Sequence, residues 1–425
     1  MDFDLDVPLD WNYLQKELPK EYFQEFLVKP IDMLSCLGLA YYNYMQNFPD
    51  IYKNKPLLRD KKIMPRIYGF KPLTPLRNLK SNLIGKFVAI SGTVVRAGNI
   101  KPLVVQMSFK CVKCETITVC HFPDGKYKYP SKCSASGCRA KNFLPLHSTA
   151  VTVDWQQIRV QETMDRKDPG RVPRTIEVEL TESLVDTCLP GDNVIIAGQV
   201  KVLSTEADKS KNKTSDKALY LIYIHANSVD NQKQLETGKL DVSSKDINGI
   251  IAISREPNLF KLIVNSICPS IYGHELIKAG LTLTIFGGST KPTEAKNSLT
   301  VRGNPHMLIV GDPGLGKSQM LTAVNYVVPR GVYVCGSYSS ATGLTVSILK
   351  ESGTGDYAIE AGALVLGDQG VCCIDEFDKM SSEHQALMEA MEQQSISVAK
   401  AGIVCNLLAR TSIIAAANPI GGHYK

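Results

Sequence analysis

The sequence predicts a multidomain fold in three parts: an N-terminal helical lobe, a small β-barrel with an inserted cysteine-rich ribbon, and an α/β domain. Apolar residues recur at helical spacing before residue 75, and short β-type runs separated by Gly, Pro and Asp follow from about residue 82. Near residue 306 an apolar strand leads into a glycine-rich loop and a helical segment. A length of 425 residues allows such a division, at roughly 100 to 200 residues per domain.

The composition disfavours several classes of protein. Hydrophobic residues make up 44% and charged residues 21%, a balance typical of neither disordered nor membrane proteins. No apolar run approaches the roughly 20 residues of a membrane span, and the acidic start MDFDLDVPLDW is unlike a signal peptide. We therefore expect an intracellular protein. The net charge of +6 permits a nucleic-acid partner but does not demonstrate one.

The domain boundaries follow from these changes of pattern. The helical lobe should cover residues 1–75, where EYFQEFL and LSCLGLAYYNYM have helical spacing before a group of prolines. The barrel should cover residues 76–236, with runs such as KFVAISGTVVRAG and NVIIAGQVKVLS and the ribbon at about residues 108–142. Residues 237–252 are polar and indicate a linker to the third part, residues 253–425.

Four cysteines in the barrel have the spacing of a zinc ribbon. Cys111 and Cys114 form a C-x2-C knuckle, and Cys133 and Cys138 form a C-x4-C knuckle, so four thiolates can complete a tetrahedral cage. A site with four protein ligands has no open position, which predicts a structural and not a catalytic zinc. Cys120 lies close by in the sequence, so the identity of the fourth ligand stays open. Four unligated core or redox cysteines are the alternative.

A polar segment between two β-type runs of the barrel carries three alternating lysines, Lys209, Lys211 and Lys213. A projecting loop with these lysines could neutralise DNA phosphates without reading the base sequence. An ordinary solvated surface loop explains the segment equally well.

The third part begins its α/β pattern with a phosphate-binding motif. The apolar run HMLIV is followed by GDPGLGKS and the helical QMLTAVNYVV, which places G-x4-G-K-S between a strand and a helix. Loop N–H groups and the helix N-terminus can hold phosphates, Lys317 can reach the β- and γ-phosphates, and the Ser318 hydroxyl can bind Mg²⁺. The residues expected to bind the nucleotide here are Gly311, Asp312, Pro313, Gly314, Leu315, Gly316, Lys317, Ser318 and Gln319.

Further along, the apolar run GVCCI ends in two carboxylates. Asp375 would support hydrated Mg²⁺, and Glu376 would polarise a water for attack on the γ-phosphate, which predicts hydrolysis beyond binding. The run TSIIAAA ends in Asn418, which could orient that water, although Asn before Pro is also a common turn. We expect a parallel sheet with its ligand at the carboxyl edge. Its strands should lie near residues 306–310, 331–335, 370–375 and 411–417.

The strings GDPGLGKSQ, CCIDEFDKM, MEQQSISVAKAGI and TSIIAAANPIGG resemble the minichromosome maintenance (MCM) family of AAA+ helicases. The N-terminal half agrees, because the helical lobe, the ribbon-bearing barrel and the segment from VPRTIEVEL to LPGDNVIIAGQV resemble the family's OB-type domain. The resemblance covers essentially the whole chain. Gly316 stands where the core replicative members carry Ala, and with GVYVCG and NPIGGHY it points to the family's eighth paralogous group.

The resemblance implies an ATP-dependent DNA helicase subunit with ATP, Mg²⁺ and Zn²⁺ as cofactors. Hydrolysis would drive translocation on single-stranded DNA, with 3′-to-5′ polarity, in a hexameric ring. The implied setting is the nucleus, in homologous recombination and double-strand break repair, with replication or meiosis as further roles. The implied partners are single-stranded and forked DNA and the ninth paralogue in a hetero-hexamer, or further copies in a homo-hexamer, and no membrane.

The resemblance also implies roles for particular residues. Lys317 and Ser318 match the P-loop lysine and magnesium serine, Asp375 and Glu376 the Walker B pair, and Asn418 sensor 1. Lys317, Glu376 and Asn418 are therefore expected to act in catalysis.

Three segments match loops that face the family's central channel. Residues 395–408 match the pre-sensor hairpin, with Lys400 at its tip on DNA, and residues 349–357 match the insert in the second helix. The lysines at 209–213 fall where the family has its N-terminal hairpin. A surface lysine at an ordinary hairpin turn is the alternative for Lys400.

The chain ends shortly after Asn418, whereas the family continues into an arginine-finger segment, a sensor 2 arginine and a lid. We expect an AAA+ core that could receive a finger from a neighbour but not supply one, and hence weak or absent turnover by the isolated chain. The alternative function is a nucleotide- and DNA-binding scaffold subunit that is not catalytic alone. A third class, AAA+ transcription activators or metal-chelatase subunits, is disfavoured by the ribbon and the barrel.

Overall fold

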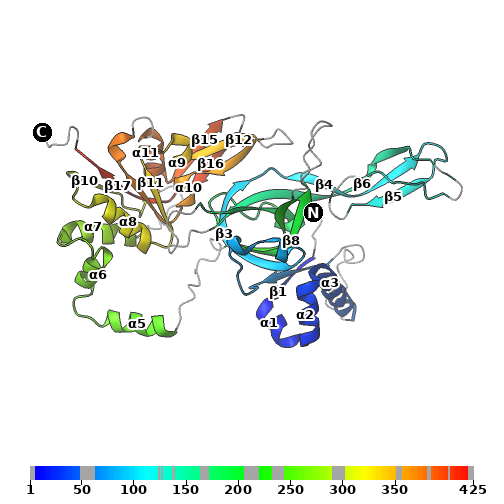
Figure 1. The fold of residues 1–425 in the computed structure, drawn as a ribbon, viewed down its shortest axis with the longest axis horizontal. Coiled ribbons are helices and arrows are strands. Elements are labelled where there is room, and N and C mark those ends of the chain that lie inside the picture. Colours follow the sequence, from blue (N-terminus) through cyan, green and yellow to red (C-terminus); the bar gives the residue numbers. More distant parts are fainter. Residues whose placement is uncertain are drawn as a thin grey trace, which may run out of the picture.

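The computed structural model places a β-barrel between a group of N-terminal helices and an α/β part, with the ribbon projecting from the barrel (Figure 1). The described residues are 5–47, 63–122, 125, 128–135, 138, 140–162, 172–204, 220–231, 244–289, 302–350, 357–380, 384–400 and 403–419. Among them, no helix is long and apolar enough to cross a membrane.

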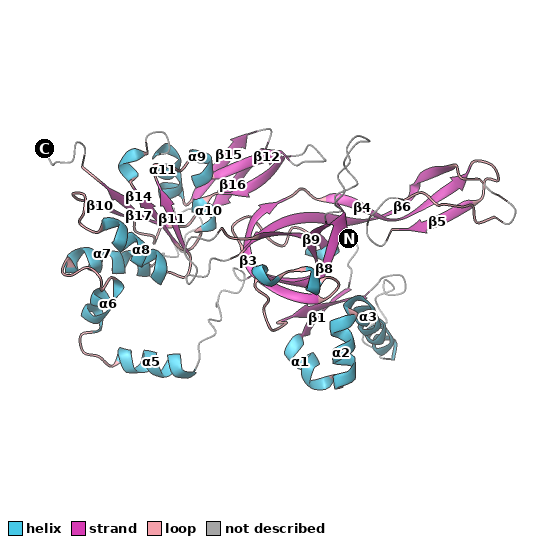
Figure 2. Cartoon of the chain, in the orientation of Figure 1, coloured by secondary structure: helices cyan, strands magenta, loops and turns pink. Residues whose placement is uncertain are grey.

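The N-terminal part combines three helices with a two-stranded parallel sheet (Figure 2). Its elements are β1 (Leu5–Asp10), α1 (Trp11–Glu17), α2 (Lys20–Val28), α3 (Pro30–Asn47) and β2 (Ile63–Tyr68). Asp10 caps α1 by accepting a hydrogen bond from the Asn12 N–H at 2.8 Å. The Trp11 ring is 3% exposed, and its centroid lies 4.4 Å from that of Phe70. The β1–β2 pair was not predicted, because both strands contain a proline, which a two-stranded sheet with two free edges tolerates.

The middle part is a closed five-stranded barrel. Strand pairing runs β3-β8-β9-β7-β6, and an additional β3–β6 pairing closes the ring. A core of alternating apolar residues, including Ile90, Ile196 and Ile224, fills it at 0% exposure. Its strands are β3 (Phe87–Ala97), β6 (Phe143–Gln161), β7 (Thr175–Thr181), β8 (Asn193–Ser204) and β9 (Tyr220–Asn231). This closed Greek-key arrangement is the OB fold that the sequence suggested.

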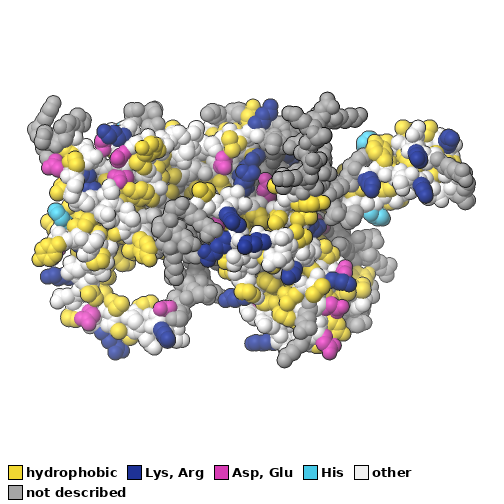
Figure 3. Space-filling view, in the orientation of Figure 1, with side chains coloured by type: hydrophobic (Ala, Val, Ile, Leu, Met, Phe, Trp, Pro, Cys, Tyr) yellow, Lys and Arg dark blue, Asp and Glu magenta, His cyan; other side chains and the backbone are white. Residues whose placement is uncertain are grey.

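The ribbon grows out of the barrel through the long strand β6. The first half of β6 pairs with β4 (Lys101–Cys111), and its second half pairs with β7 inside the barrel. Strand β5 (Ile117–His121) pairs with β4 at the edge. Lys and Arg side chains gather on the face of the ribbon drawn in Figure 3.

The α/β part contains a four-stranded sheet in which all neighbours are parallel, in the order β10-β17-β14-β11. Its strands are β10 (Met307–Val310), β11 (Gly331–Cys335), β14 (Val371–Asp375) and β17 (Ser412–Ala417), which agree with the four predicted segments. Successive residues of β14 enter two different hydrophobic clusters, with Cys373 on one face and Cys372 and Ile374 on the other. Both faces of β14 are therefore covered, which explains its uninterrupted apolar run.

Helices and a hairpin cover the two faces of this sheet. The cluster on one face contains residues of α6 (Leu259–Ile267), α7 (Glu275–Phe286) and α8 (Lys317–Val327). The cluster on the other face contains residues of α9 (Ala341–Leu344), α10 (Ala363–Leu366), α11 (His384–Gln393) and β15 (Ser395–Lys400). Helix α5 (Ser244–Ser254) falls largely within the predicted linker and buries none of its residues.

The barrel and the α/β part contact each other directly. Strand β13 (Tyr357–Ala361), paired with β12 (Val346–Lys350), also pairs with β3 of the barrel. With its amide oxygen facing the guanidinium, Asn193 of the barrel accepts hydrogen bonds from Arg330 Nε at 3.0 Å and Nη2 at 3.2 Å. These contacts join the barrel to the α/β part at the start of β11.

A buried carboxylate ties together the amino ends of three parallel strands. Asp368, which is 0% exposed, accepts hydrogen bonds from the backbone N–H of Arg410 at 2.8 Å and from its guanidinium at 3.1 Å. The Asp368 carbonyl accepts a further hydrogen bond from Arg330 at 3.1 Å. A buried carboxylate needs such partners, because an uncompensated charge in the interior is costly.

His306 predicts a pH dependence of stability. Its Nδ1 accepts a hydrogen bond from the Ile413 N–H at 3.0 Å, which ties β10 to β17. Burial lowers the pKa of His306 below its usual 6.5. The hydrogen bond to the Met391 carbonyl opposes this shift, and the charge of the nearby Arg302 adds a smaller lowering. The unfolded chain therefore binds a proton at His306 more readily than the folded chain does. The contribution of neutral His306 to the free energy of unfolding is present above about pH 6.5 and is lost as the pH falls below it.

We expect the melting temperature to fall more steeply between pH 7.5 and 5.5 in the unmodified chain than in His306→Asn. The asparagine oxygen can still accept the Ile413 N–H but does not titrate in this range. Thermal unfolding followed by circular dichroism across this pH range measures the difference. Identical pH profiles for the two proteins would contradict the assignment.

Candidate nucleotide site and metal centre

The P-loop connects β10 to α8 with a backbone that only glycine adopts easily. Gly314 and Gly316 have φ angles of 89° and 80°, in the left-handed region. A Cβ on Gly316 would also lie 2.7 Å from Ile271 Cδ1. Helix α8 begins at Lys317 directly after this turn, so its N-terminal N–H groups face the loop, as a phosphate site requires.

Lys317 lies across the loop. Its Nζ donates hydrogen bonds to the carbonyl oxygens of Gly311 at 2.6 Å and Asp312 at 2.8 Å. The ammonium group is therefore held where the loop would surround the phosphates of a nucleotide.

Asp375 ends β14 at the same edge of the sheet. Its Oδ2 accepts a hydrogen bond from the Tyr333 hydroxyl at 2.8 Å, and its Oδ1 accepts one from the Glu376 N–H at 2.9 Å. Burial raises the pKa of Asp375, but hydrogen bonds from Ser318, Tyr333 and the Glu376 N–H, with the charge of Lys317, lower it overall. An ionised carboxylate beside the Ser318 hydroxyl is a suitable oxygen donor set for Mg²⁺.

Glu376 follows with a left-handed backbone, at a φ of 51°. This turns the chain sharply after the strand, and the Glu376 carboxylate faces the end of β11. There its Oε2 accepts a hydrogen bond from the Ser337 hydroxyl, and the Cys335 Sγ lies 3.6 Å away. A left-handed conformation in a residue with a Cβ is a source of strain typical of functional sites.

Asn418 follows β17, the strand between β10 and β14. The preceding Ala417 carbonyl accepts a hydrogen bond from the Gly311 N–H at 3.4 Å, and the Asn418 N–H donates to Asp378 Oδ1 at 3.0 Å. Asn418 is therefore anchored between the P-loop and the segment after Glu376. The structure brings the predicted P-loop, Walker B and sensor 1 positions to one edge of the sheet, and their individual roles stay predictions.

Sequence reasoning missed Tyr333 and Ser337, which contact the two carboxylates. A signal was present, because YVCGS alternates protic and apolar side chains with a period of two at the end of a predicted strand.

The four predicted cysteines meet at the tip of the ribbon. The Sγ atoms of Cys111, Cys114, Cys133 and Cys138 all lie within 4.8 Å of one another. The Sγ atoms of Cys114 and Cys133 lie 3.4 Å apart, and those of Cys111 and Cys138 lie 3.9 Å apart. This all-sulfur donor set fits a structural zinc ion. Cys120 does not belong to the group, because it pairs with Met107 along the β4–β5 ladder.

One cysteine of the cluster ionises far more readily than another. Hydrogen bonds from the Thr116 side chain and backbone, and one from Cys133, lower the pKa of Cys114 to about 6. For Cys133, the Ala135 N–H lowers the pKa, but the hydrogen bond shared with Cys114 and burial raise it to about 12 overall. A thiolate at Cys114 stabilised by neighbouring thiols is a ready first ligand for a metal cation.

Comparison with known proteins identifies the family. A family model described as the MCM P-loop domain matches residues 246–425, and one described as the MCM OB domain matches residues 75–204. The chain belongs to the MCM family.

Proteins named DNA helicase MCM8 are similar over nearly the whole chain. The Gallus gallus protein is 52% identical over 424 residues, which cover 93% of this chain and 51% of that protein. The Homo sapiens protein is 52% identical over 422 residues, covering 93% and 50%, and the Xenopus tropicalis protein 50% over 452 residues, covering 100% and 52%. The predicted likeness to the eighth paralogous group is confirmed. The chain spans about half the length of these relatives.

Two of the segments predicted to match channel loops of the MCM family are described in part. In the pre-sensor segment, β15 pairs with β16 (Ile403–Leu408) so that Lys400 ends β15 opposite Ile403, at the turn of the hairpin. Strands β12 and β13 form an antiparallel pair on either side of the second predicted loop, residues 349–357, of which 351–356 lie outside the described residues. The predicted DNA-binding lysines Lys209, Lys211 and Lys213 lie outside the described residues.

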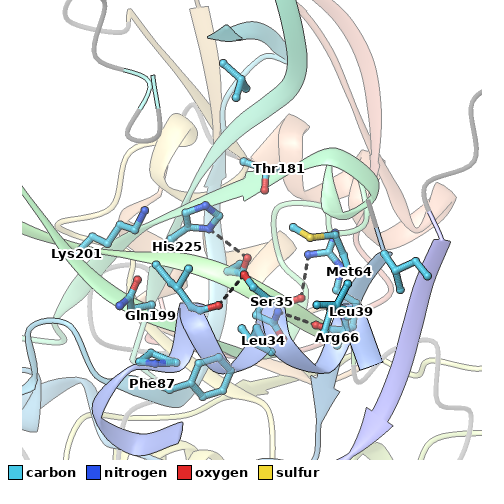
Figure 4. Close-up of a pocket in the computed structure, with 18 of the residues that line it drawn as sticks. Leu34, Ser35, Leu39, Met64, Arg66, Phe87, Thr181, Gln199, Lys201 and His225 are labelled. Carbon is cyan, nitrogen blue, oxygen red and sulfur yellow. Dashed lines mark hydrogen bonds between the residues drawn. The ribbon is translucent and has the colours of Figure 1, made fainter. Parts of the chain in front are cut away.

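A cavity of about 930 Å³ lies away from the MCM nucleotide site, between α3, β2 and the barrel (Figure 4). Arg66 lies at its wall, is 2% exposed, and forms ion pairs with Asp6 at 3.0 Å and Glu182 at 3.4 Å. Its charge is thus already compensated. None of the residues predicted for nucleotide, metal or DNA binding is among the described residues that line this cavity.

Proposed function

We propose that the chain is the ATP-hydrolysing part of an MCM-type DNA helicase. The observation that carries this proposal is the convergence of Lys317, Ser318, Asp375, Glu376 and Asn418 at the carboxyl edge of one parallel sheet. The relatives named DNA helicase support it.

The geometry supports a sequence of events for hydrolysis. The P-loop N–H groups and Lys317 hold the β- and γ-phosphates of ATP. Ser318 and Asp375 would hold Mg²⁺, which would supply positive charge to offset that of the phosphates. Glu376 accepts a proton from a water that attacks the γ-phosphorus, and Asn418 orients that water. The bond between the γ-phosphorus and the oxygen that bridges it to the β-phosphorus then breaks, and ADP and inorganic phosphate leave.

Hydrolysis would be coupled to movement along DNA by the hairpins. The β15–β16 hairpin follows α11, which comes soon after Glu376 in the chain, so a change at the nucleotide can alter the position of its tip. Lys400 at this turn would hold a phosphate of single-stranded DNA. The proposal includes a hexameric ring with the ninth paralogue or with further copies of the chain. It also includes single-stranded and forked DNA as substrates, and action in the nucleus in homologous recombination, double-strand break repair, replication or meiosis.

ATP hydrolysis tests the proposal. We would compare the 425-residue chain alone, with single-stranded DNA, and with a partner that carries an arginine finger, each beside Lys317→Ala. We expect hydrolysis with the partner and DNA, and its loss in Lys317→Ala. Binding of ATP and DNA without hydrolysis under any of these conditions would overturn the enzymatic proposal and favour the scaffold subunit.

A further inference from the structure

Strand β11 is the edge strand of the four-stranded sheet beside β14. The pairing register places Tyr333 opposite Cys373 and Cys335 opposite Asp375. Because side chains two residues apart share a face of a strand, Tyr333 and Cys335 both lie on the side of Asp375. Ser337 continues the same spacing just beyond the strand.

Two of these side chains bind different carboxylates. The Tyr333 hydroxyl donates to Asp375 Oδ2 at 2.8 Å, which leaves Oδ1 to the Glu376 N–H. The Ser337 hydroxyl donates to Glu376 Oε2, with the Cys335 sulfur 3.6 Å from the same oxygen. Each carboxylate therefore has a hydroxyl partner that limits its rotation.

The backbone after β11 is locked against the same two residues. The Gly336 N–H donates to the Asp375 carbonyl at 2.8 Å. A Cβ on Gly336 would lie 2.5 Å from the Glu376 carbonyl oxygen and 2.8 Å from Met380 Cγ. The Ser339 hydroxyl donates to the Cys335 carbonyl at 2.9 Å, which closes the turn. The backbone that carries Ser337 is therefore held close to Glu376.

We propose that Tyr333 and Ser337 are positioning residues of the nucleotide site: Tyr333 holds Asp375 in the orientation that faces Ser318, and Ser337 holds the Glu376 carboxylate. This inference rests on the proposed ATPase function. Each residue acts through the carboxylate that it orients. Groups that orient a metal-binding or basic residue commonly affect affinity or rate by about 10- to 100-fold.

The first experiment measures metal dependence without turnover. A fluorescent non-hydrolysable ATP analogue is bound to the full-length protein while Mg²⁺ is titrated. Tyr333→Phe should raise the Mg²⁺ concentration at half-saturation about 10-fold, because Asp375 loses its hydroxyl partner. Tyr338→Phe is the matched control, since Tyr338 lies in the turn just after β11 and is 93% exposed. An unchanged Mg²⁺ midpoint in Tyr333→Phe would overturn the role of Tyr333, whether or not the protein hydrolyses ATP.

The second experiment measures single-turnover hydrolysis at saturating Mg²⁺ and ATP, in the complete assembly. Ser337→Ala should lower the rate about 10-fold or more without changing binding of the analogue, and Ser337→Thr, which keeps the hydroxyl, should restore it. Ser266→Ala is the control, because the Ser266 hydroxyl donates to carbonyls of its own helix. An unaltered rate in Ser337→Ala would overturn the role of Ser337. Absence of hydrolysis in the unmodified assembly would contradict the proposed function instead, and the Mg²⁺ titration would still decide the role of Tyr333.

Discussion

Replacing Glu376 by Gln should lower ATP hydrolysis by about 10²- to 10⁴-fold while nucleotide binding stays close to normal. The glutamine has the same shape, and its oxygen can still accept the Ser337 hydroxyl that Glu376 accepts now. It cannot take a proton from the attacking water. The chemical step should therefore fail although the P-loop contacts of Lys317 and the metal site at Asp375 remain.

Two measurements separate these effects: single-turnover hydrolysis in the assembly with an arginine-finger partner, and equilibrium binding of a fluorescent nucleotide. Glu392→Gln is the matched control, because Glu392 lies exposed on α11, away from the carboxyl edge of the sheet. Hydrolysis at the normal rate in Glu376→Gln would contradict the assignment of Glu376 as the base.

Loss of zinc should unfold the ribbon while the P-loop domain stays folded. The hydrophobic core of the ribbon is small and includes Cys111 itself, at 0% exposure, beside Phe109 and Phe143. Burial of so few apolar residues cannot offset the conformational entropy that the ribbon loses on folding. The metal must therefore supply most of the free energy that keeps the ribbon folded. For small zinc domains this contribution is about 10 to 16 kcal/mol.

Cys111→Ser should therefore abolish bound zinc and expose the ribbon, at about residues 108–142, to protease. Cys120→Ser is the matched control and should change neither, because Cys120 lies outside the cluster. Metal content by mass spectrometry and limited proteolysis measure both effects, and nucleotide binding reports on the P-loop domain. One equivalent of zinc and normal protease resistance in Cys111→Ser would show that the ribbon does not depend on this ligand.

Features that depend on short stretches of chain could be predicted from the sequence. The P-loop was predictable because its glycines, lysine and serine lie within eight consecutive residues, and Gly314 and Gly316 indeed have the left-handed backbone that the loop needs. The inner strands β14 and β17 of the α/β sheet were predictable because they are buried on both faces and are therefore continuously apolar. The outer strands β10 and β11 were predictable because short apolar runs of chain form them, although both are partly exposed. The cysteine knuckles were recognisable because each pair of ligands lies in one turn.

Helix α5 and the β1–β2 pair show where local patterns mislead. Helix α5 buries nothing, so its polar residues resembled a linker. Strands β1 and β2 lie more than fifty residues apart and contain prolines, so no local alternation indicates that they pair.

The sequence by itself determined which chemical groups are available: a P-loop, two carboxylates, a sensor amide and four thiols. Only the tertiary structure decided which of them meet. The β3–β6 pairing closes the barrel, Cys120 stays outside the metal cluster, and Tyr333 and Ser337 lie against Asp375 and Glu376. The physical reason is that strand order and register between distant segments depend on long-range packing, whereas the conformation of a loop or knuckle depends on a few adjacent residues.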